Sequence, residues 1–250
     1  MKFVLNASVN WVKTPQLLRL WGYTYSGLCV LCNAPKCTLH HIISGCPIAL
    51  ASGRFTWWHD SVLAHIENSI RTHITSFKMP SKSVCAVPPL ASCFVRKGKA
   101  VKAKRSPQRR RTDLNGDLDW KLLADKTDCQ IVFPPEIIAT PARPDIIIWS
   151  CSLRRVLLIE LTCPAEEGIV PSQIFKTASY APLINNVRSN TNWSVELMTI
   201  EVGARGFVSR SVPRCLKRLG LPPSSIACVQ EPLLHLCALL VHNLPRIQNP

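Results

Sequence analysis

Two acidic residues, Asp145 and Glu160, stand at the ends of two apolar runs. The first run, 146–148, follows Asp145, and the second, 156–159, precedes Glu160. Both runs are short and rich in branched side chains, which predicts buried strands. If they form an antiparallel hairpin with a turn at 150–155, the alternation of side chains along each strand places Asp145 opposite the Glu160 end.

Two carboxylates this close repel each other unless a cation lies between them. A hard divalent cation, Mg²⁺ or Mn²⁺, prefers oxygen ligands of this kind. Such a site suits phosphodiester hydrolysis, which usually also needs a nearby basic group. Lys176 on the next predicted helix is the candidate, and Tyr180 lies four residues further along the same helical face. The alternative is that Glu160 only forms a surface ion pair with Arg154 or Arg155.

A second group of residues with chemical potential is the cysteine- and histidine-rich stretch 29–46. Three thiolates and one imidazole suit a closed tetrahedral zinc site, which is structural because no position is left open for water. The favoured ligands are Cys29, Cys32, His41 and Cys46. His40 fits the spacing almost as well as His41, and Cys37 is a spare thiol. The alternative is a set of buried, reduced cysteines.

Zinc binding can contribute on the order of 10 kcal/mol of folding free energy, and residues 1–79 bury little without it. We therefore expect one zinc ion per chain. When a chelator removes this ion, residues 20–75 should lose their ordered structure.

The carboxylates need a sheet to hold them, and the segment 113–225 has the pattern for one. Its apolar runs alternate with turn signals. The expected elements are a helix at 119–125, a strand, a turn and a strand within 129–150, a strand at 155–164, a helix at 172–187 that Pro182 kinks or ends, a strand at 193–203 and a basic helix at 209–220. This order predicts an α/β fold with mixed strand pairing.

Composition divides the chain into four regions. Residues 1–79 form the expected helical zinc-knuckle region, with helices at 15–22 and 55–74. Residues 80–112 form a Pro- and Ser-rich basic linker, 113–225 the α/β domain, and 226–250 a C-terminal helix and tail. The apolar stretch 226–244 is interrupted by polar residues and by proline, so we expect a buried amphipathic helix there and no membrane span.

The linker contains nine basic residues and no acidic residue between positions 96 and 111. They are Arg96, Lys97, Lys99, Lys102, Lys104, Arg105, Arg109, Arg110 and Arg111. Such a run is typical of a flexible segment that neutralises phosphates, and 102–111 also has the composition of a nuclear import signal. The whole chain carries a formal charge of +15, which indicates a polyanionic partner: DNA, with RNA as a second candidate.

The twelve cysteines do not indicate a disulfide-rich secreted protein, because the apolar run near residue 3 is too short for a signal peptide. We expect them to be reduced, with some of them binding metal.

Taken together, "RPDIIIWS…RRVLLIELTCPAEE" and the later lysine and tyrosine resemble the restriction-like endonuclease domain of certain non-LTR retrotransposon polyproteins. That domain belongs to the PD-(D/E)xK nucleases. The stretch "GRFTWWHDSVL", together with the cysteines before it, resembles the CCHC zinc knuckle that precedes the domain and follows the reverse transcriptase. The resemblance covers roughly residues 20–220. No reverse transcriptase is expected here, because its paired-aspartate motif is absent.

The resemblance implies a restriction-endonuclease-like mixed sheet flanked by helices, with Asp145 and Glu160 as metal ligands and Lys176 as the basic residue. It implies a nuclear, metal-dependent enzyme that nicks target DNA. The chain departs from the family pattern in three places: Thr162 replaces the motif lysine, Ser179 replaces a lysine before Tyr180, and Trp58 replaces an arginine. The first alternative is therefore a catalytically inactive, nucleic-acid-binding remnant of the same element. A second is a protein–protein adaptor.

Overall fold

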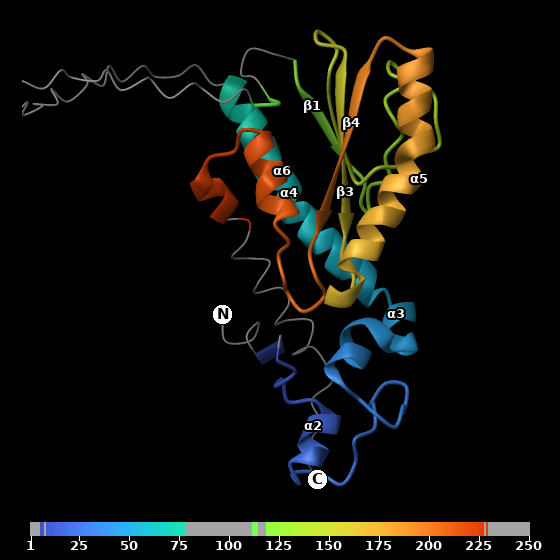
Figure 1. The fold of residues 1–250 in the computed structure, drawn as a ribbon, viewed down its shortest axis with the longest axis vertical. Helices are drawn as coiled ribbons and strands as arrows, with labels where there is room; N and C mark the ends of the chain where they lie inside the picture. Colours follow the sequence, from blue (N-terminus) through green and yellow to red (C-terminus); the bar gives the residue numbers. More distant parts are fainter. Residues whose placement is uncertain (1–5, 8, 79–111, 115–118, 228, 230–250) are drawn as a thin grey trace, which may run out of the picture.

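The computed structural model describes residues 6–7, 9–78, 112–114, 119–227 and 229. Within them, a four-stranded sheet has helices on both faces, and a smaller part of the chain lies beyond one end of the sheet (Figure 1). The strands are β1 (Lys121–Ala124), β2 (Ile146–Ser150), β3 (Arg155–Thr162) and β4 (Ser194–Glu201). The expectation of a mixed α/β fold is thus confirmed.

The strands lie in the order β1-β2-β3-β4. The pairs β1–β2 and β2–β3 are antiparallel, whereas β3–β4 is parallel. The parallel pair requires a crossover, and the helix α5 (Ile169–Asn190) provides it. Every residue of β2, and every residue of β3 after the first, is buried, which explains why these segments read as continuous apolar runs.

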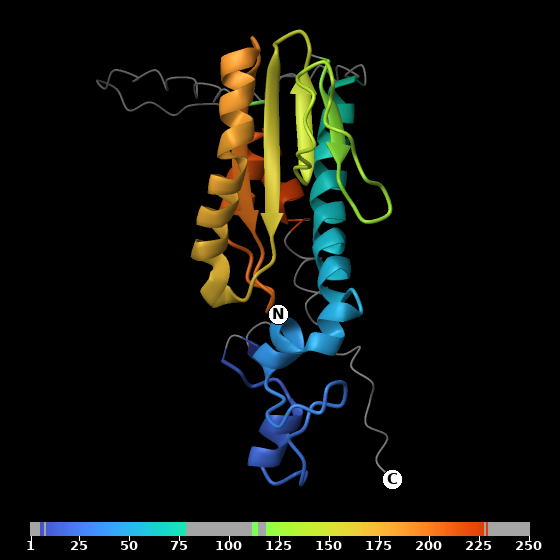
Figure 2. The same cartoon turned by 90° about the vertical axis from the view of Figure 1, so that its right-hand side faces the viewer.

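The two faces of the sheet are covered by different helices (Figure 2). On one face, α4 (Arg54–Lys78) and α6 (Ser211–Arg218) form the main core together with Ile146, Ile148 and other strand residues. On the other face, α5 and the loop around Phe133 cover Ile147 and Trp149. The hairpin therefore presents alternate residues to two separate apolar layers.

The smaller part contains α2 (Pro15–Leu20), a π-helical turn η1 (His41–Gly45) and α3 (Pro47–Ala51). It has its own small core, in which Cys37, Leu39 and Ile42 are buried. Ala204, from the loop after β4, packs in this core and joins it to the sheet. The helix α4 also joins the two parts, because it follows α3 directly and then runs along the sheet (Figure 2).

Two predicted elements of the sheet region are wrong. Residues 119–125 form no helix; they contain β1, whose Leu122 and Leu123 contact opposite apolar layers, as alternate residues of a strand do. The segment 129–133 forms no strand, apart from one isolated bridge at Cys129. The position beside β2 is taken by β1, so the chain there lies over the α5 face instead and buries Ile131 and Phe133.

The remaining helices and strands agree with expectation. The hairpin of β2 and β3, the strand β4 and the helices α2, α4 and α6 all form at the predicted places. Pro182 lies inside α5 and does not end it. A 3-10 turn, η2 (Glu166–Gly168), precedes α5. Within the described part of the chain, no helix combines the length and apolarity that a membrane crossing needs.

The basic linker and the C-terminal tail are not settled by the structure. The nine basic residues between 96 and 111 lie outside the described residues, and so does most of the predicted tail helix at 226–244. Their roles stay predictions.

Candidate functional site

Asp145 and Glu160 lie side by side at one end of the β2–β3 hairpin. The register pairs Ile146 with Ile159, so Asp145 and Glu160 are the next residues along the two strands. The amide N of Asp145 donates to Oε2 of Glu160 over 3.3 Å, and the amide N of Leu161 donates to Oδ2 of Asp145 over 2.7 Å. Each carboxylate thus accepts a hydrogen bond from the other strand, which fixes the pair.

Both carboxylates are shielded from water. The side chain of Glu160 is 2% exposed and that of Asp145 is 14% exposed. Burial and the nearby charge of Asp145 raise the pKa of Glu160, while the ammonium group of Lys176 opposes that rise. A carboxylate in such a place needs positive charge beside it.

Two residues of α5 reach the pair from the other side. Lys176 Nζ donates to Oε1 of Glu160, and the Lys176 side chain keeps 33% of its surface exposed. The hydroxyl of Tyr180 donates to the carbonyl of Arg143 over 3.1 Å. Burial and the charge of Glu160 raise the pKa of Tyr180, so its hydroxyl keeps its proton. The four residues selected from the sequence for the carboxylate site therefore come together.

His59 on α4 completes this group, and the sequence reasoning missed it. Its Nε2 lies 3.5 Å from Oδ2 of Asp145, and its Nδ1 lies 3.2 Å from Oδ1 of Asp60. Burial lowers the pKa of His59, but hydrogen bonding to Asp145 and its charge outweigh that and raise the pKa to about 9. The sequence shows only a histidine beside an aspartate on a predicted helix. It does not show against which strand that helix packs.

A cavity of about 430 Å³ opens beside the carboxylates. It is lined by residues of α4, the end of β3 and the start of α5: Phe55, His59, Leu161, Thr162, Cys163, Pro164, Pro171, Ser172, Phe175 and Lys176. The hydroxyl oxygen of Thr162 is buried and has no hydrogen-bond partner among the described residues. The cavity is thus lined by two cationic side chains, His59 and Lys176, and by the hydroxyl-bearing side chain of Thr162.

Thr162 and Ser179, which stand where the resemblance predicts lysines, have different surroundings. Thr162 lines the cavity, and Lys176 also lines it, from the neighbouring helix. Ser179 is exposed, and its hydroxyl donates to the carbonyl of Phe175 within α5 over 2.8 Å. Among the described residues that line the cavity, the lysine is Lys176.

Asp145 and Glu160 supply carboxylate oxygens to this site. Two carboxylates converge there, and oxygen ligands of this kind bind Mg²⁺ or Mn²⁺. Lys176 already supplies a positive charge to Glu160, so a metal ion and this ammonium group would share the same carboxylate.

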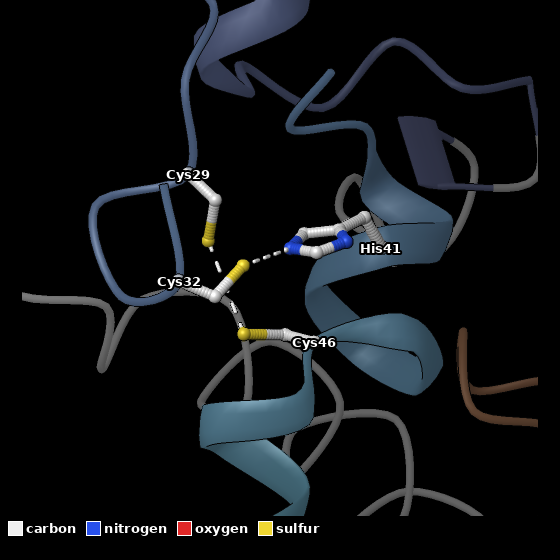
Figure 3. A group of neighbouring side chains, drawn as sticks. All are labelled: Cys29, Cys32, His41 and Cys46. Carbon is white, nitrogen blue, oxygen red and sulfur yellow. Dashed lines mark hydrogen bonds between the residues drawn. The ribbon is translucent and has the colours of Figure 1, made fainter. Parts of the chain in front are cut away.

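The Cys/His stretch forms a second compact group (Figure 3). The Sγ atoms of Cys29, Cys32 and Cys46 and a ring nitrogen of His41 all lie within 4.8 Å of one another. Sγ of Cys32 is 3.2 Å from Nε2 of His41, and Sγ of Cys29 is 3.9 Å from Sγ of Cys46. Three sulfur atoms and one imidazole nitrogen are the donors of a closed structural zinc site.

Local backbone structure explains why these four side chains converge. A tight turn joins Cys29 to Cys32, with the amide of Asn33 donating to the carbonyl of Cys29 over 2.8 Å. Asn33 has a φ of 61°, a left-handed conformation that asparagine tolerates better than most residues. The π-helical turn η1 then separates His41 from Cys46 by five residues, the spacing of one i→i+5 turn.

The structure also distinguishes among the alternative ligands. His41 belongs to the group, whereas His40 is exposed and does not. Cys37 is buried in the small core, and burial raises the pKa of its thiol to about 12. In contrast, backbone hydrogen bonds from Cys32 and Leu31 outweigh burial at Cys29 and lower its pKa to about 6. Cys29 is thus disposed toward the thiolate form that binds metal.

No protein-family model matches this chain, and no curated protein matches it either. The structure shows a mixed α/β fold and a Cys/His group that can hold a metal ion. Function has to be argued from these features and from the carboxylate site.

Proposed function

We propose that this chain is a divalent-metal-dependent, endonuclease-like protein derived from the C-terminal part of a non-LTR retrotransposon polyprotein. In this proposal a zinc knuckle precedes a restriction-like nuclease domain, and the target is DNA in the nucleus. One observation carries the proposal: Asp145 and Glu160 converge at the end of a buried hairpin, and Lys176 contacts Glu160 from the crossover helix.

The residues of the site have separable roles. Asp145 and Glu160 would hold Mg²⁺ or Mn²⁺ through their carboxyl oxygens. When bound, such an ion supplies an activated water and neutralises charge on the scissile phosphate. Lys176 would hold a positive charge at the cavity and attract a phosphate oxygen. His59 would keep Asp145 in place, because its ring contacts that carboxylate and Asp60 at once.

Charge supports nucleic acid as the substrate class. The chain has a formal charge of +15, and no residue before Asp60 is acidic. The end of β3 that carries Glu160 points toward this acid-free part of the chain (Figure 1). A polyanion is therefore attracted to the end of the molecule at which the carboxylates lie.

The proposal is tested with supercoiled plasmid, zinc-loaded protein and either Mg²⁺ or Mn²⁺. We expect metal-dependent nicking by the wild type and none by Asp145→Ala. The matched control is Asp128→Ala, which removes an exposed carboxylate and should leave nicking unchanged. Zinc content and circular dichroism establish that each variant is folded. Equal nicking by wild type and Asp145→Ala would refute the assignment.

A second candidate function, nucleic-acid binding without cleavage, is favoured by one specific observation. Lys176 already neutralises Glu160, and Thr162 supplies no positive charge to the cavity that it lines. For this candidate we expect plasmid binding without nicking under every metal condition. Thr162→Lys would then place an ammonium group in the cavity, and nicking gained by that variant would identify Thr162 as the cause of inactivity.

A further inference from the structure

Four aromatic rings are exposed on the part of the chain before the cysteine group. The exposed fractions are 65% for Trp11, 41% for Trp21, 78% for Tyr23 and 106% for Tyr25. We call these four residues the aromatic face. The ring centroids of Trp11 and Trp21 are 6.1 Å apart, and those of Trp21 and Tyr23 are 6.3 Å apart, both edge-on. Trp11, Trp21 and Tyr23 thus form a continuous chain of rings that water can reach.

The backbone that carries Trp21 and Tyr23 is well defined, although these rings stay exposed among the described residues. Thr14 caps α2 by accepting a hydrogen bond from the amide of Leu17 over 3.3 Å. At the other end, Gly22 has a φ of 77°, and the amide of Tyr23 donates to the carbonyl of Leu18 over 2.9 Å. This is a left-handed helix termination of the kind that glycine permits. Trp21 and Tyr23 are therefore held on either side of a defined turn.

A hollow of about 670 Å³ lies beside these rings. Its lining combines apolar, cationic and hydroxyl-bearing side chains: Lys13, Pro15, Leu18, Trp21, Tyr23, Thr24 and Ser26. Small-molecule sites have volumes of roughly 300–1,000 Å³, so the hollow has room for a nucleotide-sized group.

Charge identifies the class of occupant. Lys13, Arg19 and Lys36 are exposed in this part of the chain, and no acidic residue occurs before Asp60. Exposed rings beside cations, with no carboxylate to repel phosphate, are how proteins bind single-stranded nucleic acid. A duplex hides the faces of its bases, so it offers nothing for these rings to stack on.

We propose that the aromatic face binds single-stranded nucleic acid, with unpaired bases stacking on Trp11, Trp21 and Tyr23 and phosphates attracted by Lys13 and Arg19. This inference goes beyond the proposed nuclease and does not depend on it, because no residue of the aromatic face contacts the carboxylate site. The aromatic face would be a second binding site for nucleic acid on the same molecule, separate from the carboxylate site.

The test uses the full-length, zinc-loaded chain and fluorescein-labelled probes of equal length: oligo(dT), oligo(U) and a duplex. Anisotropy reports the affinity for each probe. We expect the wild type to bind oligo(dT) or oligo(U) more tightly than the duplex. The double variant Trp11→Ala/Tyr23→Ala should lose at least about fivefold in affinity for the single strand, since stacking typically contributes 1–3 kcal/mol per base.

Three controls make the outcome decisive. Phe207→Ala removes an aromatic ring that is 51% exposed elsewhere, and its affinity should equal that of the wild type. Trp11→Phe/Tyr23→Phe keeps two rings and should keep most of the affinity, which separates stacking from misfolding. Binding is measured without added Mg²⁺ or Mn²⁺, so that a failure of the nuclease proposal leaves this result unaffected.

Two results would overturn the inference. One is equal single-strand affinity of the wild type and the Trp11→Ala/Tyr23→Ala variant. The other is wild-type binding to vesicles of anionic phospholipid, lost in the same variant, with no binding to either oligonucleotide. That pattern would assign the exposed tryptophan and tyrosine rings to a membrane surface instead.

Discussion

The Cys/His group and the carboxylate site hold reactive side chains together in different ways. Around the Cys/His group, the small core consists mainly of Ala, Cys, Leu and Ile side chains from short elements. Around the carboxylate site, a large apolar core fills one face of the sheet, and a second apolar layer covers the other. A metal ion would therefore contribute much of the stability around the first group, whereas the second lies on a scaffold held by apolar packing.

The comparison separates a role of metal in folding from a role of metal in chemistry. Three closely spaced thiolates would repel one another, so a zinc ion bound to them and to His41 would stabilise the fold. Asp145 and Glu160 already have His59 and Lys176 beside them. An ion at the second site would therefore change reactivity more than stability.

The largest effect should follow loss of zinc. Trp58 and later α4 residues pack in the sheet core, so we narrow the expected loss of order to residues 20–53. Treatment with a strong chelator, or Cys46→Ser, should remove one zinc per chain and on the order of 10 kcal/mol of local stability. Hydrogen exchange should become fast in 20–53 and stay slow in β3. Cys129→Ser changes an exposed cysteine and serves as the control.

If β3 lost its protection together with residues 20–53, the two regions would fold as one unit. The distinction between a metal-held part and an apolar-held part would then be wrong. Elemental analysis of the purified wild type that shows no zinc would remove the metal-held part altogether.

The next effect tests the apolar scaffold. Trp58 is 1% exposed in the main core, and its indole N–H has no hydrogen-bond partner among the described residues. Trp58→Ala should lower the free energy of unfolding by about 3–5 kcal/mol because it leaves a large cavity. Zinc content should stay at the wild-type value. Trp57→Ala alters the neighbouring ring, which is 44% exposed, and should cost far less. Equal costs for the two variants in urea unfolding would contradict the packing described above.

A smaller effect is expected from the charge balance at the carboxylates. Lys176→Met removes the cation that contacts Glu160. Without added Mg²⁺ or Mn²⁺, we expect the free energy of unfolding at neutral pH to fall by about 1–3 kcal/mol. Adding Mn²⁺ should restore part of the loss in thermal unfolding, since ligand binding to the folded state stabilises it.

Lys176→Arg is the conservative control and should stay close to the wild type. If Lys176→Met were as stable as the wild type, with or without Mn²⁺, then the ammonium group would not be balancing the buried pair.

The smallest effect concerns the other end of the hairpin, where no metal is involved. Asp119 accepts hydrogen bonds from the hydroxyl of Ser150 over 2.5 Å and from the amide of Cys151 over 3.1 Å. The Ser150 bond is the main reason that the pKa of Asp119 is lowered to about 2. Asp119 is exposed, so Asp119→Asn should cost only about 0.5–1 kcal/mol at neutral pH.

The pH dependence of that cost has a defined sign. A carboxyl group with a lowered pKa in the folded state stabilises the protein above its unfolded pKa, and it loses this contribution as the pH falls through its folded pKa. The difference in free energy of unfolding between wild type and Asp119→Asn should therefore shrink as the pH falls from about 4 to about 2. Unfolding followed by tryptophan fluorescence measures it, with Asp128→Asn as the control. A difference that is constant over this range would contradict the assignment.

The features that sequence predicts well are the local ones. The hairpin follows from two apolar runs, and the four residues of the Cys/His group lie within 29–46, so spacing alone selects most of them. Two decisions needed the structure. Burial and position separate His41 from His40, and pairing with β2 makes a strand of 121–124, whose leucines and lysine also suit a helix.

His59 shows why the rest could not be predicted. Its chemistry depends on the face of α4 that meets the end of β2, and helical periodicity gives a face but not its neighbour. The cavity has the same origin, because it forms only where α4, β3 and α5 approach one another. Contacts between elements far apart in sequence are set by packing, which a single sequence does not display.

The continuity of α4 has a consequence for how the two parts can diverge. The helix runs from Arg54 to Lys78 without an interrupting glycine or proline. Its 25 residues, at a rise of 1.5 Å each, give a length of about 37 Å. One residue inserted near its start would rotate everything before it by about 100° relative to the sheet. Substitutions in either part leave this angle unchanged, whereas insertions and deletions in the helix do not. The length of α4 therefore constrains the Cys/His part and the sheet together.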